Sequence, residues 1–191
     1  MPRIHGVREK RHQPFWDTLV RTTGTPAVAL NPSTLLFGNA NIGNRAFTNL
    51  DVAGQLASDQ TYIVLALRCW LYFDGTNDRA LYQQVTSQLY FTFILGDRPQ
   101  FFAPCWYHPA GGGVFGFDST TAIYNHGMPT QESIMKLGKP ITIPVRQNIS
   151  VQADFFAVGT TNVLTLINSP ATDDQMVIMY MIDGIQTRDV M

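Results

Sequence analysis

The residues that could do chemistry are few in this sequence, and their spacing does not assemble a recognisable site. No two of the four histidines are separated by a single residue, the spacing that lets two imidazoles on one strand converge on a metal. Cys105 and His108 could approach each other if the chain turns, but no carboxylate stands near them to orient the histidine. The sequence therefore predicts no metal site, no cofactor and no catalytic nucleophile.

The acidic and glycine-rich segments are better explained as turns. Asp74 and Asp78 flank one short turn and Asp173 precedes Asp174 in another, where such side chains usually bond to nearby backbone. The glycines at 111–113 lack the GK[ST] ending of a phosphate-binding loop. We therefore predict a structural or binding protein and not an enzyme, with an enzyme of unrecognised site as the last alternative.

Residues 101–109 form the most distinctive segment, because five of them carry aromatic or imidazole rings: FFAPCWYHP. Buried rings would fill a core, whereas exposed rings could anchor a protein partner or stack on sugars. Trp106 and Tyr107 are the candidate surface anchors. Together with His108 and the glycines at 111–113, they are also the candidate surface of a glycan- or receptor-binding module.

The elements that must position these residues are predicted to be strands, because apolar side chains alternate with period two. Residues 60–73 alternate with both faces largely apolar, residues 85–95 continue the pattern, and residues 148–155 have one polar face. No helix of convincing length is predicted. Further strands are predicted at 26–30, 34–37, 100–106, 114–117, 133–143, 162–167 and 176–183.

Turns and prolines between these strands indicate how the chain connects them. Pro140 and Pro144 bracket three apolar residues, and proline cannot donate to a β-ladder. This segment is therefore predicted to be an edge or a corner where the chain passes between two sheets. Long connections such as 117–132 favour Greek-key over meander topology. We predict one all-β domain, a single jelly-roll or Greek-key β-sandwich over residues 26–191.

Residues 1–25 differ in charge from the rest of the chain. They carry five basic and two acidic residues, a net charge of +3, whereas the remainder carries eight basic and twelve acidic residues. Five basic residues are too few to predict specific nucleic-acid binding. We predict an extended N-terminal arm that reaches neighbouring subunits and whose deletion leaves a folded sandwich. Its candidate subunit contacts are Arg3, Arg8, Lys10, Arg11, Phe15 and Trp16.

The composition points toward burial against partners. Only 14% of the residues are charged, against roughly 25% in ordinary soluble proteins. The alternative explanation is a large, aromatic-rich core. Cys69 and Cys105 are expected to be buried thiols, with a disulfide left open. The longest apolar run, 62–73, contains Arg68 and is shorter than the ~20 residues that span a bilayer. With no signal peptide in view, we expect synthesis in a host cytoplasm and no membrane partner.

Several segments taken together resemble small structural proteins of bacterial-virus particles: LFGN (36–39), TYIVLALRCWLYFDG (61–75), PAGGGVFGFD (109–118), KPITIPVRQNISVQADFF (139–156) and MIDGIQTRDV (181–190). The chain looks like a jelly-roll capsid cement, decoration or minor capsid protein. That resemblance implies a place in the virion and symmetric contacts, as in a homotrimer. It also implies partners among copies of the chain, the major capsid protein and other virion subunits. The alternative function remains the glycan- or receptor-binding module.

Overall fold

The computed structural model describes residues 7–21, 33–38, 44–56, 60–74, 78–109, 115–117, 123–125, 134–156 and 175–190. Predicted strands at 26–30 and 162–167 lie outside these residues. The elements are β1 (Val7–His12), β2 (Phe15–Arg21), β3 (Ser33–Leu36), β4 (Gln60–Asp74), α1 (Asp78–Gln88), β5 (Leu89–Leu95), β6 (Arg98–Pro104), the 3₁₀ turn η1 (Cys105–Tyr107), β7 (Phe115–Phe117), β8 (Ile123–Asn125), β9 (Lys136–Ile143), β10 (Ile149–Phe155) and β11 (Gln175–Val190). No helix in these ranges is long and apolar enough to cross a membrane.

Two antiparallel sheets form a sandwich. The large sheet has the order β1-β11-β4-β9 with β2 also paired to β11, and the small sheet has the order β3-β10-β5-β6. If β2, β3, β4, β5, β6, β9, β10 and β11 are counted from one to eight, the sheets run 1-8-3-6 and 2-7-4-5. That order is the jelly roll, two Greek keys wound together. The predicted all-β jelly-roll sandwich is confirmed, and β7 with β8 forms a separate pair.

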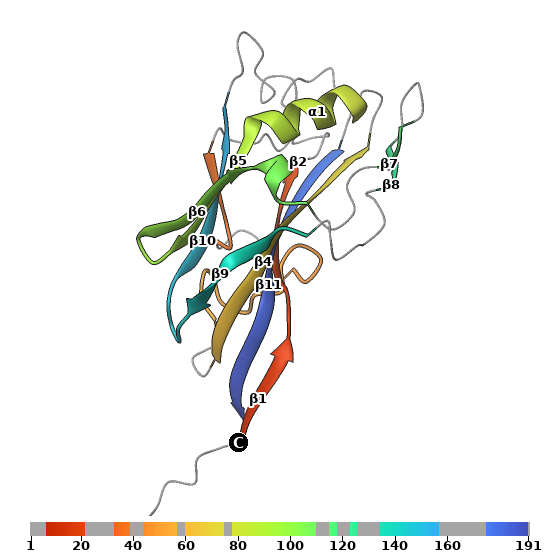
Figure 1. The fold of residues 1–191 in the computed structure, drawn as a ribbon. Coiled ribbons are helices and arrows are strands. Elements are labelled where there is room, and N and C mark those ends of the chain that lie inside the picture. Colours follow the sequence, from red (N-terminus) through yellow and green to blue (C-terminus); the bar gives the residue numbers. More distant parts are fainter. Residues whose placement is uncertain are drawn as a thin grey trace, which may run out of the picture.

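The large sheet is longer than the small one. Figure 1 shows α1 lying across one end of the sandwich, while β1 and the C-terminal half of β11 project from the other end. Strand β2 pairs with Met176–Ile182 of β11, and β1 pairs with Ile185–Val190 further along. The two N-terminal strands therefore lie one after the other along the same side of β11.

The expectation of an extended arm is wrong for residues 7–21, because β1 and β2 complete the large sheet of their own chain. Phe15 and Leu19 belong to the buried core. The buried Asp17 accepts a hydrogen bond from the backbone N–H of Phe37, next to β3 in the other sheet. Deleting residues 1–25 would remove these contacts and leave one side of β11 unpaired. Residues 1–6 and 22–25 lie outside the described ranges.

The core lies between the two sheets. The rings of Phe91 in β5 and Tyr180 in β11 are both fully buried, and their centroids are 4.6 Å apart across the sandwich. Strand β10 shows the predicted alternation: Ile149, Val151 and Ala153 are buried and the residues between them are partly exposed. One face of the small sheet therefore packs on the core and the other faces outward.

A β-bulge in β4 changes which face of the strand is buried. Val64 pairs with Gly184 and Ala66 with Asp183, so Leu65 is an extra residue opposite β11. Before the bulge the core-facing positions are even-numbered, as in Val64, and after it they are odd-numbered, as in Leu67. The strand at 60–73 is confirmed, but its uninterrupted alternation hides this switch because both faces are apolar.

The predicted crossing between the sheets at Pro140–Pro144 is confirmed. Strand β9 contains Pro140 and forms an edge of the large sheet, while β10 lies inside the small sheet. A proline is tolerated at such an edge because its missing N–H breaks no ladder. The chain changes sheets in the turn between Pro144 and Asn148.

The strand predicted at 85–95 is partly wrong. Residues 85–88 form the last turn of α1, and β5 begins only at Leu89. Four residues are too few to distinguish helical from strand periodicity. Val85 and Gln88 are buried in the helix, so the tertiary contacts of α1 decide the conformation here.

Candidate functional site

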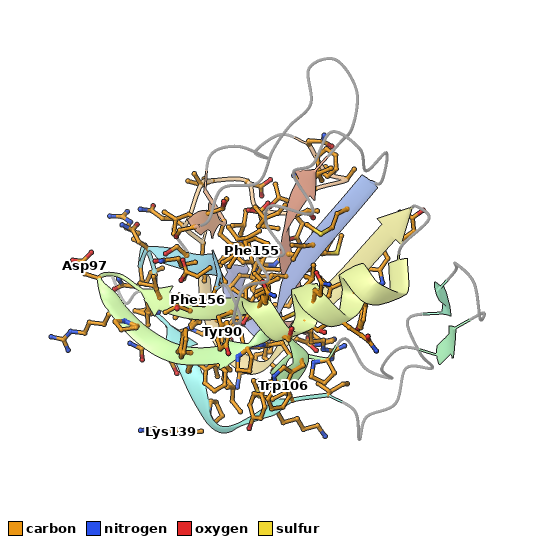
Figure 2. All side chains as sticks on the ribbon, turned by 90° about the horizontal axis from the view of Figure 1, so that it is seen from above. Tyr90, Asp97, Trp106, Lys139, Phe155 and Phe156 are labelled. Atoms are coloured by element: carbon orange, nitrogen blue, oxygen red, sulfur yellow. The ribbon has the colours of Figure 1, made fainter. Side chains whose placement is uncertain are left out.

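Exposed rings cluster on the outer face of the small sheet. Phe102 is 57% exposed and Phe156 is 49% exposed. Tyr90 contacts both rings: it is stacked on Phe102, with centroids 5.5 Å apart, and it meets Phe156 edge-on at 5.2 Å. Figure 2 labels Tyr90 and Phe156 close to each other. We call Tyr90, Phe102 and Phe156 the aromatic cluster. Because the three rings are contiguous, the aromatic cluster is a candidate binding surface.

The 3₁₀ turn that follows β6 adds two more exposed rings. Trp106 is 63% exposed and Tyr107 is 45% exposed, and their rings meet edge-on with centroids 5.8 Å apart. Both candidate anchors therefore lie at the surface, where their proposed role remains a prediction. Their planes are 84° apart, so the two rings do not form one flat platform.

His108 ends the same segment but lies in the core. Its ring is fully buried among Phe91, Phe101, Tyr107 and Tyr180, with centroids 5.5–6.3 Å away. Nδ1 donates a hydrogen bond to the Pro104 carbonyl at 3.1 Å. Burial lowers the pKa of His108 to about 4, so its imidazole is neutral at pH 7. Including His108 in a surface binding site was therefore wrong, and the glycines at 111–113 lie outside the described residues.

Cys105 and His108 do not form a catalytic pair. The Cys105 thiol lies 3.7 Å from the Cys69 thiol, and Nε2 of His108 has no hydrogen-bond partner among the residues that the structure describes. Burial raises the pKa of the Cys69 thiol, which disfavours the reactive thiolate. Within the described ranges, no three His, Cys, Asp or Glu side chains are placed to hold a metal ion.

The basic residues of β1 are divided between the surface and a pocket. Arg8 and Lys10 are exposed on this edge strand of the large sheet. Their neighbour Glu9 forms an ion pair with Arg188 of β11 at 2.6 Å. A charged edge strand discourages unspecific pairing with other strands but still attracts an oppositely charged surface.

The other predicted contacts lie further inside. Phe15 is 7% exposed and packs its ring 4.9 Å from that of Tyr62, so its prediction as a subunit contact is wrong. Its side chain belongs to the core beneath β2 and also lines the pocket beside β1. Trp16 is half-buried, and Arg3 lies outside the described residues.

A pocket of about 420 Å³, lined by both polar and apolar side chains, opens beside β1. Its walls come from the β1–β2 connection, residues 45–56, the start of β4 and β11. Arg11 Nε donates to Gln186 Oε1 at 2.5 Å, and Gln186 Nε2 donates to Gln60 Oε1 at 2.5 Å. Gln186 is buried with both ends of its amide satisfied, so this row of side chains is a fixed part of the pocket. Trp16 also lines it.

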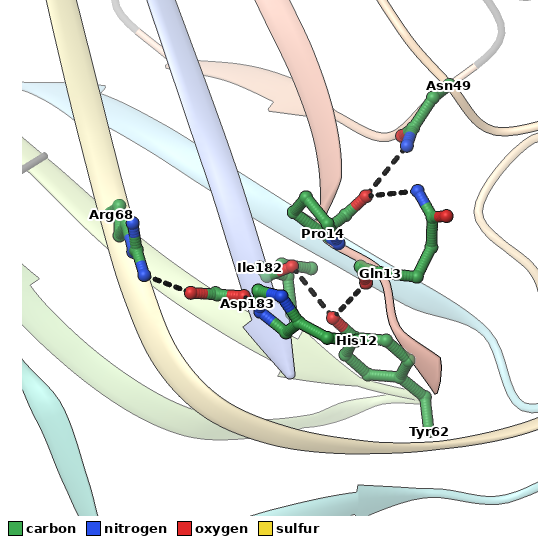
Figure 3. A network of polar contacts seen from close by, with 8 residues as sticks. All are labelled: His12, Gln13, Pro14, Asn49, Tyr62, Arg68, Ile182 and Asp183. Atoms are coloured by element: carbon green, nitrogen blue, oxygen red, sulfur yellow. Dashed lines mark hydrogen bonds and ion pairs between the residues drawn. The ribbon is translucent and has the colours of Figure 1, made fainter. Parts of the chain in front are cut away.

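A polar network fastens β1 and β2 to the sheet at the bulge (Figure 3). The buried carboxylate of Asp183 contacts Arg68 of β4 and His12 of β1. The hydroxyl of Tyr62 lies 2.6 Å from the Gln13 carbonyl and 3.1 Å from the Ile182 carbonyl. Burial, followed by the charge of Asp183, raises the pKa of Tyr62 well above its ordinary value. These contacts join β1, β2, β4 and β11.

Sequence reasoning missed Asp183, Arg68 and Gln186, although one signal was present. Asp183 and Gly184 interrupt the apolar run of the last strand. A glycine inside a strand often marks a bulge or a close backbone approach. A Cβ at Gly184 would lie 2.0 Å from the Ile63 carbonyl oxygen, so the close approach is real.

The strand order and these surfaces define the class: a jelly-roll β-sandwich with exposed rings on one sheet and a charged, projecting edge strand. Comparisons with models of protein families, with curated proteins and with solved structures found no match to this chain.

Proposed function

We propose that this chain is a structural subunit of a bacteriophage virion, a capsid cement, decoration or minor capsid protein. It would stabilise the shell through contacts with copies of itself, as in a homotrimer, and with the major capsid protein or other virion subunits. The observation that carries the proposal is the exposure of Phe102, Trp106, Tyr107 and Phe156, each between 45% and 63%. Interfaces between subunits place aromatic rings at their centres and charged residues at their rims.

The partner that fits best is a second copy of the same chain. Residues 1–25 carry a net charge of +3 and the rest of the chain carries more acidic than basic residues. The exposed Lys10 on the projecting strand β1 would therefore meet an acidic body on the neighbouring copy. Repeated around a symmetry axis, this contact gives a closed ring of subunits. In a shell, many such modest contacts add through multivalency.

Static light scattering across a dilution series tests this proposal. We expect a trimer or larger closed assembly, and we expect the double variant Phe102→Ser with Trp106→Ser to dissociate at higher concentrations. Val145→Ser is the matched control, because Val145 is also 45% exposed but lies in the turn after β9. A wild-type chain that stays monomeric at every concentration would contradict the proposal, as would equal dissociation of the control.

A glycan- or receptor-binding module is the second candidate, favoured by the exposure of Trp106 and Tyr107 next to each other on η1. A sugar ring could stack on either indole or phenol face. A glycan array probed with the wild-type chain and with Trp106→Ala discriminates the two functions. Hits that disappear in the variant would support the glycan-binding module. An array without hits would reject that module, and the assembly role would be the remaining candidate.

A further inference from the structure

Cys69 and Cys105 are the two thiols of this chain, and the fold holds them together in the core. Their sulfur atoms are 3.7 Å apart although the residues are separated by 36 positions in the sequence. Both are free thiols and both side chains are buried. A disulfide bond needs the sulfurs at about 2.05 Å, so closing it requires a movement of less than about 2 Å.

The backbone fixes this approach on both sides. Cys69 lies in the middle of β4, opposite Tyr180 in β11. Its N–H donates to the His108 carbonyl at 2.7 Å, and Cys69 also forms a β-bridge with Pro109. These contacts clamp the segment that carries Cys105 against β4. The proximity of the two thiols is therefore part of the fold and does not depend on a mobile side chain.

We propose that Cys69 and Cys105 are the site of an oxidative modification, a disulfide that links β4 of the large sheet to η1 at the end of the small sheet. The co-reactant is a low-molecular-weight disulfide. Cys105 attacks one sulfur of that disulfide, forms a mixed disulfide and releases one thiol; Cys69 then attacks the Cys105 sulfur and releases the second thiol. The protein loses two hydrogens, and the small disulfide is reduced to two thiols.

The order of the two attacks follows from the elements involved. Cys105 begins a turn of three residues whose next two side chains, Trp106 and Tyr107, face water. We expect the first attack at Cys105, because it lies in this turn and not in a β-ladder. Cys69 is held between Tyr180 of β11 and its bridge to Pro109, next to the segment that carries Cys105. The burial of both thiols makes the reaction slow.

The cross-link would stabilise the folded chain, because it joins the two sheets and closes the loop that contains α1, β5 and β6. In a reducing cytoplasm the thiols stay reduced, and in an oxidising environment the bond persists. The inference does not rest on the proposed virion role, since it depends only on the position of the two sulfurs.

The test treats the folded full-length chain with oxidised glutathione and maps its peptides without reduction. We expect loss of both thiols, one peptide pair joining Cys69 to Cys105, and a rise of the melting temperature by about 10 °C that dithiothreitol reverses. Cys69→Ala should retain glutathione on Cys105, and Cys105→Ala should stay unmodified at Cys69. Both variants are compared with the oxidised wild-type chain on the same peptide map, which does not require equal stability.

Two outcomes would overturn the inference. The first is a folded wild-type chain that keeps both thiols through prolonged oxidation and forms the linked peptide only after denaturation. The second is a linkage found only between separate chains, visible as a dimer on non-reducing gels.

Discussion

The two ends of the sandwich differ in what holds their strands in place. At the α1 end, rings pack against rings: Phe91, His108 and Tyr180 fill the core, and Nε2 of His108 and the hydroxyl of Tyr180 have no partner among the described residues. At the β1 end, where the large sheet projects (Figure 1), Asp183 and Gln186 join neighbouring strands through ion pairs and amide hydrogen bonds. Apolar packing depends on shape, whereas the polar end depends on ion pairs and hydrogen bonds, although Nε of Arg68 also has no hydrogen-bond partner among the described residues.

The largest effect is expected at the bulge that separates these two ends. Gly184→Val would place a Cβ 2.0 Å from the Ile63 carbonyl oxygen, which is backbone and cannot move aside cheaply. We expect the free energy of unfolding to fall by at least about 4 kcal/mol, or the chain to be insoluble. Urea unfolding measures it. Gly138→Val is the control, because nothing lies within 4 Å of a Cβ there, and a Gly138 variant equally damaged would contradict the account.

A change at His108 tests the apolar end through pH. Its pKa is about 4 in the folded chain and about 6.5 when unfolded. Between these values the unfolded chain binds a proton that the folded chain does not, so stability falls as the pH drops from 6.5 to 4. The loss from this residue should reach about 3 kcal/mol. Urea unfolding at several pH values measures it.

The control is His108→Phe, which keeps a ring in the same space but does not titrate. The difference in pH dependence between the two proteins isolates the histidine from the carboxylates. Parallel curves for the wild-type chain and the variant between pH 6.5 and 4 would show that His108 is not held neutral by burial.

A somewhat smaller effect is expected from the polar end. Asp183→Asn removes the negative charge between Arg68 and His12, and the partly buried Arg68 loses its carboxylate partner. Because Arg68 and His12 are partly exposed, solvent screens their charges, and we expect the free energy of unfolding to fall by about 2 kcal/mol. Asp51→Asn is the matched control, because its ion pair with Arg45 lies at the surface. Equal decreases of the melting temperature in the two variants would contradict the role given to the Asp183 ion pairs.

The parts of the fold that the sequence predicted are those decided by local pattern. Strand β10 was predictable because polar and apolar residues alternate without interruption, and Pro140 marked the edge strand. The bulge at Leu65 was not predictable, because both faces of β4 are apolar and only pairing with Gly184 reveals the slip. The charges of residues 8–11 concealed the strand β1, whose partners lie at the far end of the chain.

The candidate site divides in the same way. Trp106 and Tyr107 could be singled out from the sequence because five of the nine residues at 101–109 carry aromatic or imidazole rings, although only the fold shows that these two are exposed. The pocket beside β1 could not be predicted from the sequence, since Arg11, Gln60 and Gln186 come from three strands that only the tertiary fold brings together. The role of Asp183 could not be predicted for a related reason: its ion pairs are with Arg68 and His12, which are distant in sequence.

The proposed assembly places the exposed rings of β6 and η1 at contacts between copies of the chain. Hydroxyl-radical footprinting with mass spectrometry tests it most directly, by comparing the labelling of Phe102 and Trp106 in concentrated and in dilute protein. The account predicts that both rings are protected at high concentration and labelled on dilution, while Val145 is labelled equally in both. Equal labelling of Phe102 and Trp106 at the two concentrations would contradict it.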